Sequence, residues 1–294
     1  MGFSDGCQRR GGRRIARSVR GLAGLSLAIA GLAVLSATAL GRGAATTTAG
    51  YRLQGSDGSL FAFHVPGYGS VPGRGVHVTN LVGMAPASKG YWMVQSTGGI
   101  FAFGNAKNYG SLTALGVKVN NVVGIAATPD FGGYWMVAST GAVYTFGDAH
   151  FYGSLPGRGV VVNDIVAILR PDAGGYWLIG SDGRVYNFGD AKHLGGCNGT
   201  CGVIVGGASP DAGGYWLASR TGGVYKFGDA RFHGACPSTH AGCGSVSDIV
   251  GIANLGAGGY WLAGADGAVY DFGTAPFFGD ESGLAYPIVA ITHG

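Results

Sequence analysis

"GGYWMVASTGAVYTFGDAHFYGSL" occupies residues 132–155 of this 294-residue chain, and close copies of it recur along most of the sequence. The Gly-Tyr step that opens the phrase recurs in register at six places, at intervals of 39 to 45 residues. Periods of that length are typical of solenoids and propellers, so the repeat is the first guide to the fold. The six steps end at Tyr51, Tyr91, Tyr134, Tyr176, Tyr215 and Tyr260.

Each repeat predicts four short β-strands. The stretch 134–139, "YWMVAS", is apolar on both alternations, and a strand of that kind must be covered on both faces. A turn such as "STG" follows, where glycine supplies the positive φ that a hairpin requires. We expect "AVYTF" to be the next strand and "HFYGSL" to be the outermost one. Neighbouring repeats must then stack, because a lone unit would leave its aromatic rings in water.

The two ends of the repeat region predict how the array is completed. The first repeat begins at Tyr51 without the short apolar strand that precedes the others, whereas the chain ends with "PIVAITHG" at 287–294. That ending matches "DIVAILRP" at 164–171, so we expect it to supply the missing strand. The predicted fold is all-β, a six-bladed β-propeller of four-stranded blades closed by the C-terminal strand. The alternative is an open stack, which would need polar capping repeats.

The repeats resemble those of secreted bacterial propeller-like proteins, which read "GYWLVASDGGVFAFGDAxFYGS". The similarity covers about residues 50–294, and several aromatic and glycine positions agree in register. It implies an exported module at the cell surface or cell wall, and it carries no catalytic residues to this chain. The first repeat departs from the pattern, with Arg52 in place of tryptophan.

The charge distribution separates a leader from the repeats. Seven of the 19 basic residues but only one of the 15 acidic residues lie within residues 1–50. The remainder is slightly acidic, which argues against nucleic-acid binding. The basic segment precedes an apolar stretch at 21–40, so residues 1–45 are expected to be a signal peptide or an N-terminal membrane anchor helix. Residues 46–294 would form the propeller, exported and monomeric, with any membrane contact made through the leader.

Four cysteines lie in two connections between repeats. An exported chain favours disulfides, and the short spacings favour the local pairs Cys197–Cys201 and Cys236–Cys243. The alternative is a zinc site that would include His233 and His240. We otherwise expect neither a metal nor a cofactor.

The connections after each fourth strand vary most between repeats and are expected to carry binding. They share one face with the hairpin turns in known propellers. The candidate ligand-binding residues on this loop face are Arg74, Lys118, Arg158, Asp280 and Glu281.

The leading hypothesis is a non-catalytic propeller that binds a protein or glycan partner. Two alternatives stay open. One is a hydrolase or lyase with its centre on the propeller axis, using Asp280, Glu281 and His233. The other is a purely structural envelope protein.

Overall fold

The computed structural model describes residues 49–171, 174–236, 243 and 246–294, all within the unit Thr46–Gly294. The predicted leader, residues 1–45, lies outside the described residues. The described part contains 18 β-strands and three short 3-10 helices, so the all-β prediction is confirmed. None of its helices is long and apolar enough to span a bilayer.

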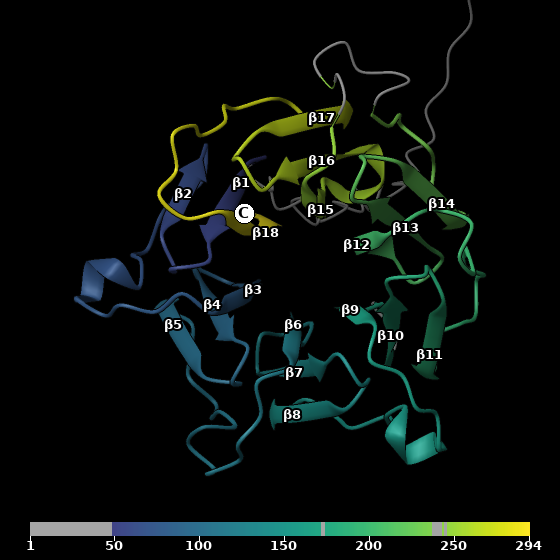
Figure 1. Cartoon of the computed structure of the whole chain (residues 1–294), viewed down its shortest axis with the longest axis horizontal. Helices are drawn as coiled ribbons and strands as arrows, with labels where there is room; N and C mark the ends of the chain where they lie inside the picture. Colours follow the sequence, from purple (N-terminus) through teal and green to yellow (C-terminus); the bar gives the residue numbers. More distant parts are fainter. Residues whose placement is uncertain (1–48, 172–173, 237–242, 244–245) are drawn as a thin grey trace, which may run out of the picture. The chain divides into compact units, whose positions relative to one another are not determined.

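Six three-stranded antiparallel sheets make up this unit, and their innermost strands face a common centre (Figure 1). The inner strands are β3 (Leu81–Ala87), β6 (Val122–Ala127), β9 (Ile165–Leu169), β12 (Ile204–Asp211), β15 (Ile249–Asn254) and β18 (Ile288–His293). The middle strands are β1 (Tyr51–Gly55), β4 (Gly90–Gln95), β7 (Gly133–Ala138), β10 (Gly175–Gly180), β13 (Gly214–Ser219) and β16 (Gly259–Gly264). The outer strands are β2 (Leu60–Phe63), β5 (Ile100–Gly104), β8 (Val143–Gly147), β11 (Val185–Gly189), β14 (Val224–Gly228) and β17 (Val269–Gly273). The 3-10 helices are η1 (Pro72–Arg74), η2 (Pro156–Arg158) and η3 (Gly256–Gly258).

The prediction of a fourth strand in each sheet is wrong. In the segment "HFYGSL", Gly153 has a φ of +122°, which a β-strand does not adopt, and Phe151 is half exposed. The segment attaches to the next sheet instead, because its Gly153 carbonyl accepts a hydrogen bond from the Tyr176 hydroxyl at 2.5 Å. The segment is therefore held by a hydrogen bond from a tyrosine hydroxyl, and not by the backbone hydrogen bonds of a fourth strand that the sequence pattern predicted.

The C-terminal segment supplies the inner strand of the first sheet, as the sequence predicted. Strand β18 pairs antiparallel with β1, with Leu53 opposite Ile291, and β1 pairs in turn with β2. Strand β18 also contacts the inner strands of the sixth and second sheets, β15 and β3. Segments from the two ends of the repeat region thus share one sheet.

Both faces of each middle strand pack against a neighbouring sheet. In β7, Tyr134 and Met136 cluster with residues of the second sheet, including Trp92. On its other face, Trp135 and Val137 cluster with residues of the fourth sheet. The prediction that the strand would be covered on both sides is confirmed.

A belt of backbone hydrogen bonds also joins the sheets. The first residue of each inner strand donates its N–H to a carbonyl in the hairpin turn of the preceding sheet, at 2.8 to 3.0 Å. These donor and acceptor pairs are Leu81 and Ser56, Val122 and Ser96, Ile165 and Ser139, Ile204 and Ser181, Ile249 and Arg220, and Ile288 and Ala265. All six sheets take part, so each hairpin turn is bonded to the inner strand of the following sheet.

The tyrosines of the Gly-Tyr steps are buried between the sheets. Each is essentially inaccessible to solvent, and each hydroxyl donates to a loop glycine carbonyl of the preceding sheet. Burial raises the pKa of Tyr134, Tyr176 and Tyr260 to about 12 and also raises the pKa of Tyr51, Tyr91 and Tyr215.

These raised pKa values predict alkaline unfolding. A phenol whose pKa is raised on folding stabilises the fold fully below its unfolded pKa, about 10. That stability is lost as the pH rises toward the folded pKa, about 12 for Tyr134. We therefore expect circular dichroism to stay constant to about pH 10 and then to change together with phenolate absorbance. Ionisation of these tyrosines near pH 10 without loss of structure would contradict the assignment.

Arg52 takes the place of tryptophan in the first sheet and reproduces its hydrogen bond. In the other sheets the indole Nε1 donates to a backbone carbonyl fifteen residues later, as Trp92 does to Lys107 at 2.8 Å. Arg52 Nε donates to the Pro66 carbonyl at 3.0 Å. Its guanidinium carbon also lies 5.4 Å from the centre of the Tyr91 ring, so a cation–π contact replaces ring packing. Arg52 therefore replaces tryptophan and keeps both its hydrogen bond to the backbone and its contact with a neighbouring ring.

Gln54 is a site where the fold is destabilised. Its side chain is fully buried, and neither amide atom has a hydrogen-bond partner among the described residues. The middle strands of the other sheets have Val94, Val137, Ile179, Ala218 and Ala263 at this place.

Replacing this buried amide with an apolar side chain is expected to stabilise the protein. Because an unpaired buried polar group costs about 1–3 kcal/mol, the Gln54→Leu variant should gain stability of that order in urea unfolding. Gln95→Leu is the control: Gln95 Nε2 donates to Asn80 Oδ1 at 2.8 Å, so its loss should not stabilise. An ordered water on the Gln54 amide would remove the gain.

Candidate functional site

The variable loops and the hairpin turns share one face of the unit, here called the turn face. It is defined by the hairpin turns at 56–58, 96–98, 139–141, 181–183, 220–222 and 265–267. In each sheet a loop residue donates its N–H to the carbonyl of the turn glycine, at 2.8 to 3.2 Å. These pairs are Val71 and Gly58, Leu112 and Gly98, Leu155 and Gly141, Cys197 and Gly183, Cys236 and Gly222, and Glu281 and Gly267.

The turn glycines are required by both conformation and space. Gly141 has a φ of +74°, and a Cβ atom there would lie 2.5 Å from Leu155 Cδ1. A larger residue would therefore push the loop away from the turn. The prediction that loops and turns share a face is confirmed by these contacts.

Two of the predicted ligand-binding residues are engaged in packing. Arg74 Nη2 donates to the Ala102 carbonyl at 2.6 Å, and its guanidinium lies 4.0 Å from the centre of the Phe103 ring. Arg158 does the same on the next-but-one connection, with a 2.9 Å bond to the Asn187 carbonyl and a 3.8 Å approach to Phe188. Both arginines therefore fasten a loop to the following sheet.

The other three predicted residues are spread around the turn face. Lys118 is exposed in the loop before β6, whereas Asp280 and Glu281 lie in the loop before β18. Asp280 is exposed, and Glu281 is half-buried with its N–H on the Gly267 carbonyl. The five residues come from four loops and do not line the cavities described below, and their ligand-binding role stays a prediction.

The cysteines form the local pairs that the sequence favoured. Cys197 is joined to Cys201, and Cys236 to Cys243. Their sulfur atoms are therefore not available as zinc ligands, and the described residues contain no group of three or more potential metal ligands. The His233 ring lies within 2.9 Å of the Ala257 carbonyl through Nε2 and packs beside Tyr260, which gives it a structural role.

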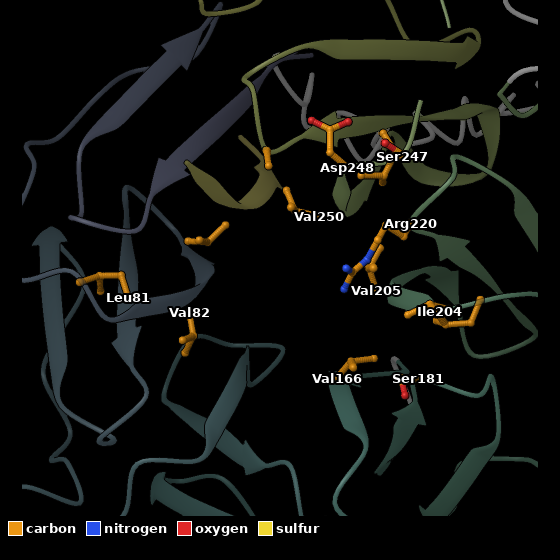
Figure 2. A pocket seen from close by; sticks show the side chains of 14 residues that line it. Leu81, Val82, Val166, Ser181, Ile204, Val205, Arg220, Ser247, Asp248 and Val250 are labelled. Atoms are coloured by element: carbon orange, nitrogen blue, oxygen red, sulfur yellow. The ribbon is translucent and has the colours of Figure 1, made fainter. Parts of the chain in front are cut away.

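A cavity opens on the turn face at the common centre of the sheets. This axial cavity has a volume of ≈ 680 Å³. Its wall is apolar and includes one valine from each of five inner strands, and its edge includes Arg220, Ser181, Ser247 and Asp248 (Figure 2). The five valines are Val82, Val166, Val205, Val250 and Val289.

Each of these valines is the extra residue of a β-bulge. In the second sheet, for example, Leu81 pairs with Gln95 and Gly83 with Val94, which leaves Val82 unpaired between them. A bulge turns a side chain away from the regular alternation, so five valines project to the cavity while the residues before them enter the core. Alternation alone could not have predicted this wall.

The cavity narrows below the valines. The next residue in each inner strand is glycine or alanine, which allows the backbones of neighbouring strands to approach closely. At this level the inner strands carry Gly83, Gly124, Ala167, Gly206, Gly251 and Ala290. A Cβ atom at Gly83 would lie 3.6 Å from the Gly124 Cα, so the backbones of neighbouring strands approach closely. The space enclosed here by all six inner strands is only ≈ 130 Å³.

Arg220 is the functional candidate that sequence reasoning missed. It opens the hairpin turn of the fifth sheet, where the other sheets carry Ser56, Ser96, Ser139, Ser181 and Ala265. The signal was present in the turn sequences, since "RTG" alone begins with a charged residue. Its importance appears only in three dimensions, because the side chain points into the axial cavity (Figure 2).

The comparisons with known proteins identify the fold and no family. No protein-family profile and no curated protein matches the chain. A chain in the crystal structure of a nidogen–laminin complex is similar, with 10% identity and a TM-score of 0.57, covering 83% of this chain and 97% of that chain. The computationally designed Ika8 protein has 12% identity and a TM-score of 0.45, covering 80% of this chain and 72% of its own.

The six sheets around one cavity, together with the likeness to the nidogen–laminin chain, define a β-propeller-like protein. Identity as low as 10% carries fold information alone, so function must be argued from the surface of this chain.

Proposed function

We propose that this chain is an exported, non-catalytic binding module, built as a closed six-bladed ring, that engages a protein partner through its turn face. The observation that carries the proposal is the gathering of the variable loops on that face, each bonded to a rigid hairpin turn. Loops on a rigid scaffold are the usual location of binding surfaces. The belt of backbone hydrogen bonds around all six sheets supports the ring.

Exposed apolar side chains on these loops favour a protein over a glycan. Leu115 is 70% exposed, Val161 is 96% exposed and Val203 is 52% exposed. These side chains come from the three consecutive loops before β6, β9 and β12, and large exposed apolar side chains on a binding face are characteristic of protein interfaces. The neighbour in the nidogen–laminin complex is itself part of a protein complex.

The lining of the axial cavity does not support the alternative of a hydrolase or lyase with its active site on the propeller axis. Its candidates Asp280, Glu281 and His233 are not among the residues that line the axial cavity. Asp248 is the one carboxylate on that wall.

Site-specific photo-crosslinking in the cells that produce the chain tests partner binding. A crosslinker in place of Val161 should give defined protein adducts, because this side chain projects from the turn face. The matched control is Phe151, which is 52% exposed in the same loop but immediately after β8, at the other end of the sheet. Equal adducts from both positions, or adducts only to glycans, would contradict a protein partner on this face.

Export is proposed from the leader and supported by the disulfides, which persist in oxidising compartments. N-terminal sequencing of the extracytoplasmic protein should find a start near residue 46 if the leader is a signal peptide. An intact N-terminus on membranes would indicate the anchor instead. Protein found only in the reducing cytoplasm would contradict export.

A further inference from the structure

The axial cavity combines an apolar wall with one positively charged side chain at its mouth. Its volume of ≈ 680 Å³ lies within the range of about 300–1,000 Å³ that is typical of small-molecule sites. The five valines form the inner wall, and Arg220 lies at the edge. A ligand that matches this arrangement has an anionic end and an apolar body.

Arg220 is held in position by its backbone and leaves its guanidinium available. Its N–H donates to the Val203 carbonyl at 2.8 Å, and its carbonyl accepts from Ile249 at 3.0 Å. Among the described residues, no hydrogen bond or ion pair engages its side chain. It therefore differs from Arg74 and Arg158, whose guanidinium groups are bound to carbonyls.

The surroundings of Arg220 favour an external anion over an internal partner. Asp248 immediately precedes β15 of the neighbouring sheet, and its carboxylate points away from the guanidinium (Figure 2). Val203, which precedes the inner strand of the same sheet, stands where four other sheets have the polar residues Asn80, Asn121, Asp164 and Asp248. On the side of Val203 the mouth is therefore apolar.

We propose that the axial cavity is a binding site for alkyl carboxylates. The carboxylate accepts paired hydrogen bonds from the Arg220 guanidinium at the mouth, a geometry for which arginine is suited. The alkyl chain extends inward along the five valines. The site opens on the turn face and shares Val203 with the loops of the proposed function, but Arg220 and the five valines belong to a hairpin turn and the inner strands, so either proposal can hold without the other.

The narrowing of the cavity sets a limit on chain length. Burial of each methylene favours binding about fourfold as long as the chain contacts the valine wall. Below the valines the space enclosed by the six inner strands is only ≈ 130 Å³, so a longer chain gains little further contact with the valine wall. Affinity should therefore rise along a series of carboxylates and then level off.

Calorimetric titration of the full chain with hexanoate, octanoate and decanoate, each kept below its micelle concentration, tests the site. We expect affinity to rise with chain length and decanoate to bind more tightly than decanol. In Arg220→Ala the advantage of decanoate over decanol should vanish, with a loss of about tenfold for decanoate, as expected for a charge-assisted hydrogen bond. Lys226→Ala is the matched control, because it removes an exposed positive charge from β14 of the same sheet.

A second variant tests the apolar wall separately. Val205→Phe should fill the cavity and weaken decanoate and decanol alike, while the methyl NMR signals of the remaining valines report whether the ligand lies against them. Decanoate binding that is unchanged in Arg220→Ala, or absent from the unmodified chain, would overturn the proposal. Binding of a peptide with an apolar C-terminal residue and a free carboxylate, without binding of decanoate, would also overturn it.

Discussion

Deletion of residues 287–294 is expected to abolish cooperative folding of the whole propeller-like unit. The deletion removes β18, which pairs with β1 and contacts the inner strands of the sheets on either side. It also removes Ile288 and Ile291, both buried. Truncation of one such side chain costs about 2–5 kcal/mol, and the entire stability of a domain is usually about 5–15 kcal/mol. Thermal melts followed by circular dichroism should lose their cooperative transition.

A circular permutant separates loss of the strand from loss of chain continuity. The Gly294 N–H donates to the Gly50 carbonyl at 3.0 Å, so a short linker can join the two ends. New termini at the exposed Gly283 would leave all 18 strands intact. We expect this permutant to fold with at least the stability of the parent. A cooperative melt in the deletion variant, within a few degrees of the full chain, would show that β18 is dispensable.

The Trp216→Ala variant should lose about 3–5 kcal/mol of stability, the cost of removing a large buried aromatic side chain. Trp216 is fully buried between the fifth and sixth sheets, with its ring 5.2 Å from that of Tyr260. Its Nε1 also donates to the Arg231 carbonyl at 2.7 Å, a bond that alanine cannot replace. Urea unfolding measured by circular dichroism gives the free-energy change directly.

Two further variants show where this loss arises. Lys226→Ala changes an exposed residue on β14 of the same sheet and should stay within about 0.5 kcal/mol of the parent. Trp216→Phe keeps an aromatic ring but removes the indole hydrogen bond, so we expect an intermediate loss. Equal stability of Trp216→Ala and Lys226→Ala would mean that the tryptophans do not hold the sheets together.

The repeat made most of the fold predictable. The six Gly-Tyr steps predicted six units, and the doubly apolar stretch around Trp135 predicted that each middle strand would be covered on both faces. The match of the C-terminal segment to the first strand of other repeats predicted its pairing with β1. These inferences succeeded because alternation and repetition are local properties of the chain.

The candidate site was far less predictable. Arg74 and Arg158 looked like free loop charges in the sequence, yet both bind carbonyls of the following sheet. Arg220 looked like an ordinary turn residue, yet its side chain enters the axial cavity. Whether a charged side chain packs or stays available depends on a neighbour about 30 residues away or on another sheet, which no local pattern records.

By itself, the sequence determined the all-β class, the number of sheets and the sharing of one sheet by the two ends of the repeat region, because a strand that is apolar on both faces must be covered on both. Only the tertiary structure decided the rest. Positive-φ glycines such as Gly153 converted the expected fourth strand into a loop, and β-bulges turned the valines toward the centre. Both depend on how the backbone of one sheet meets the next, and that is set by packing in three dimensions.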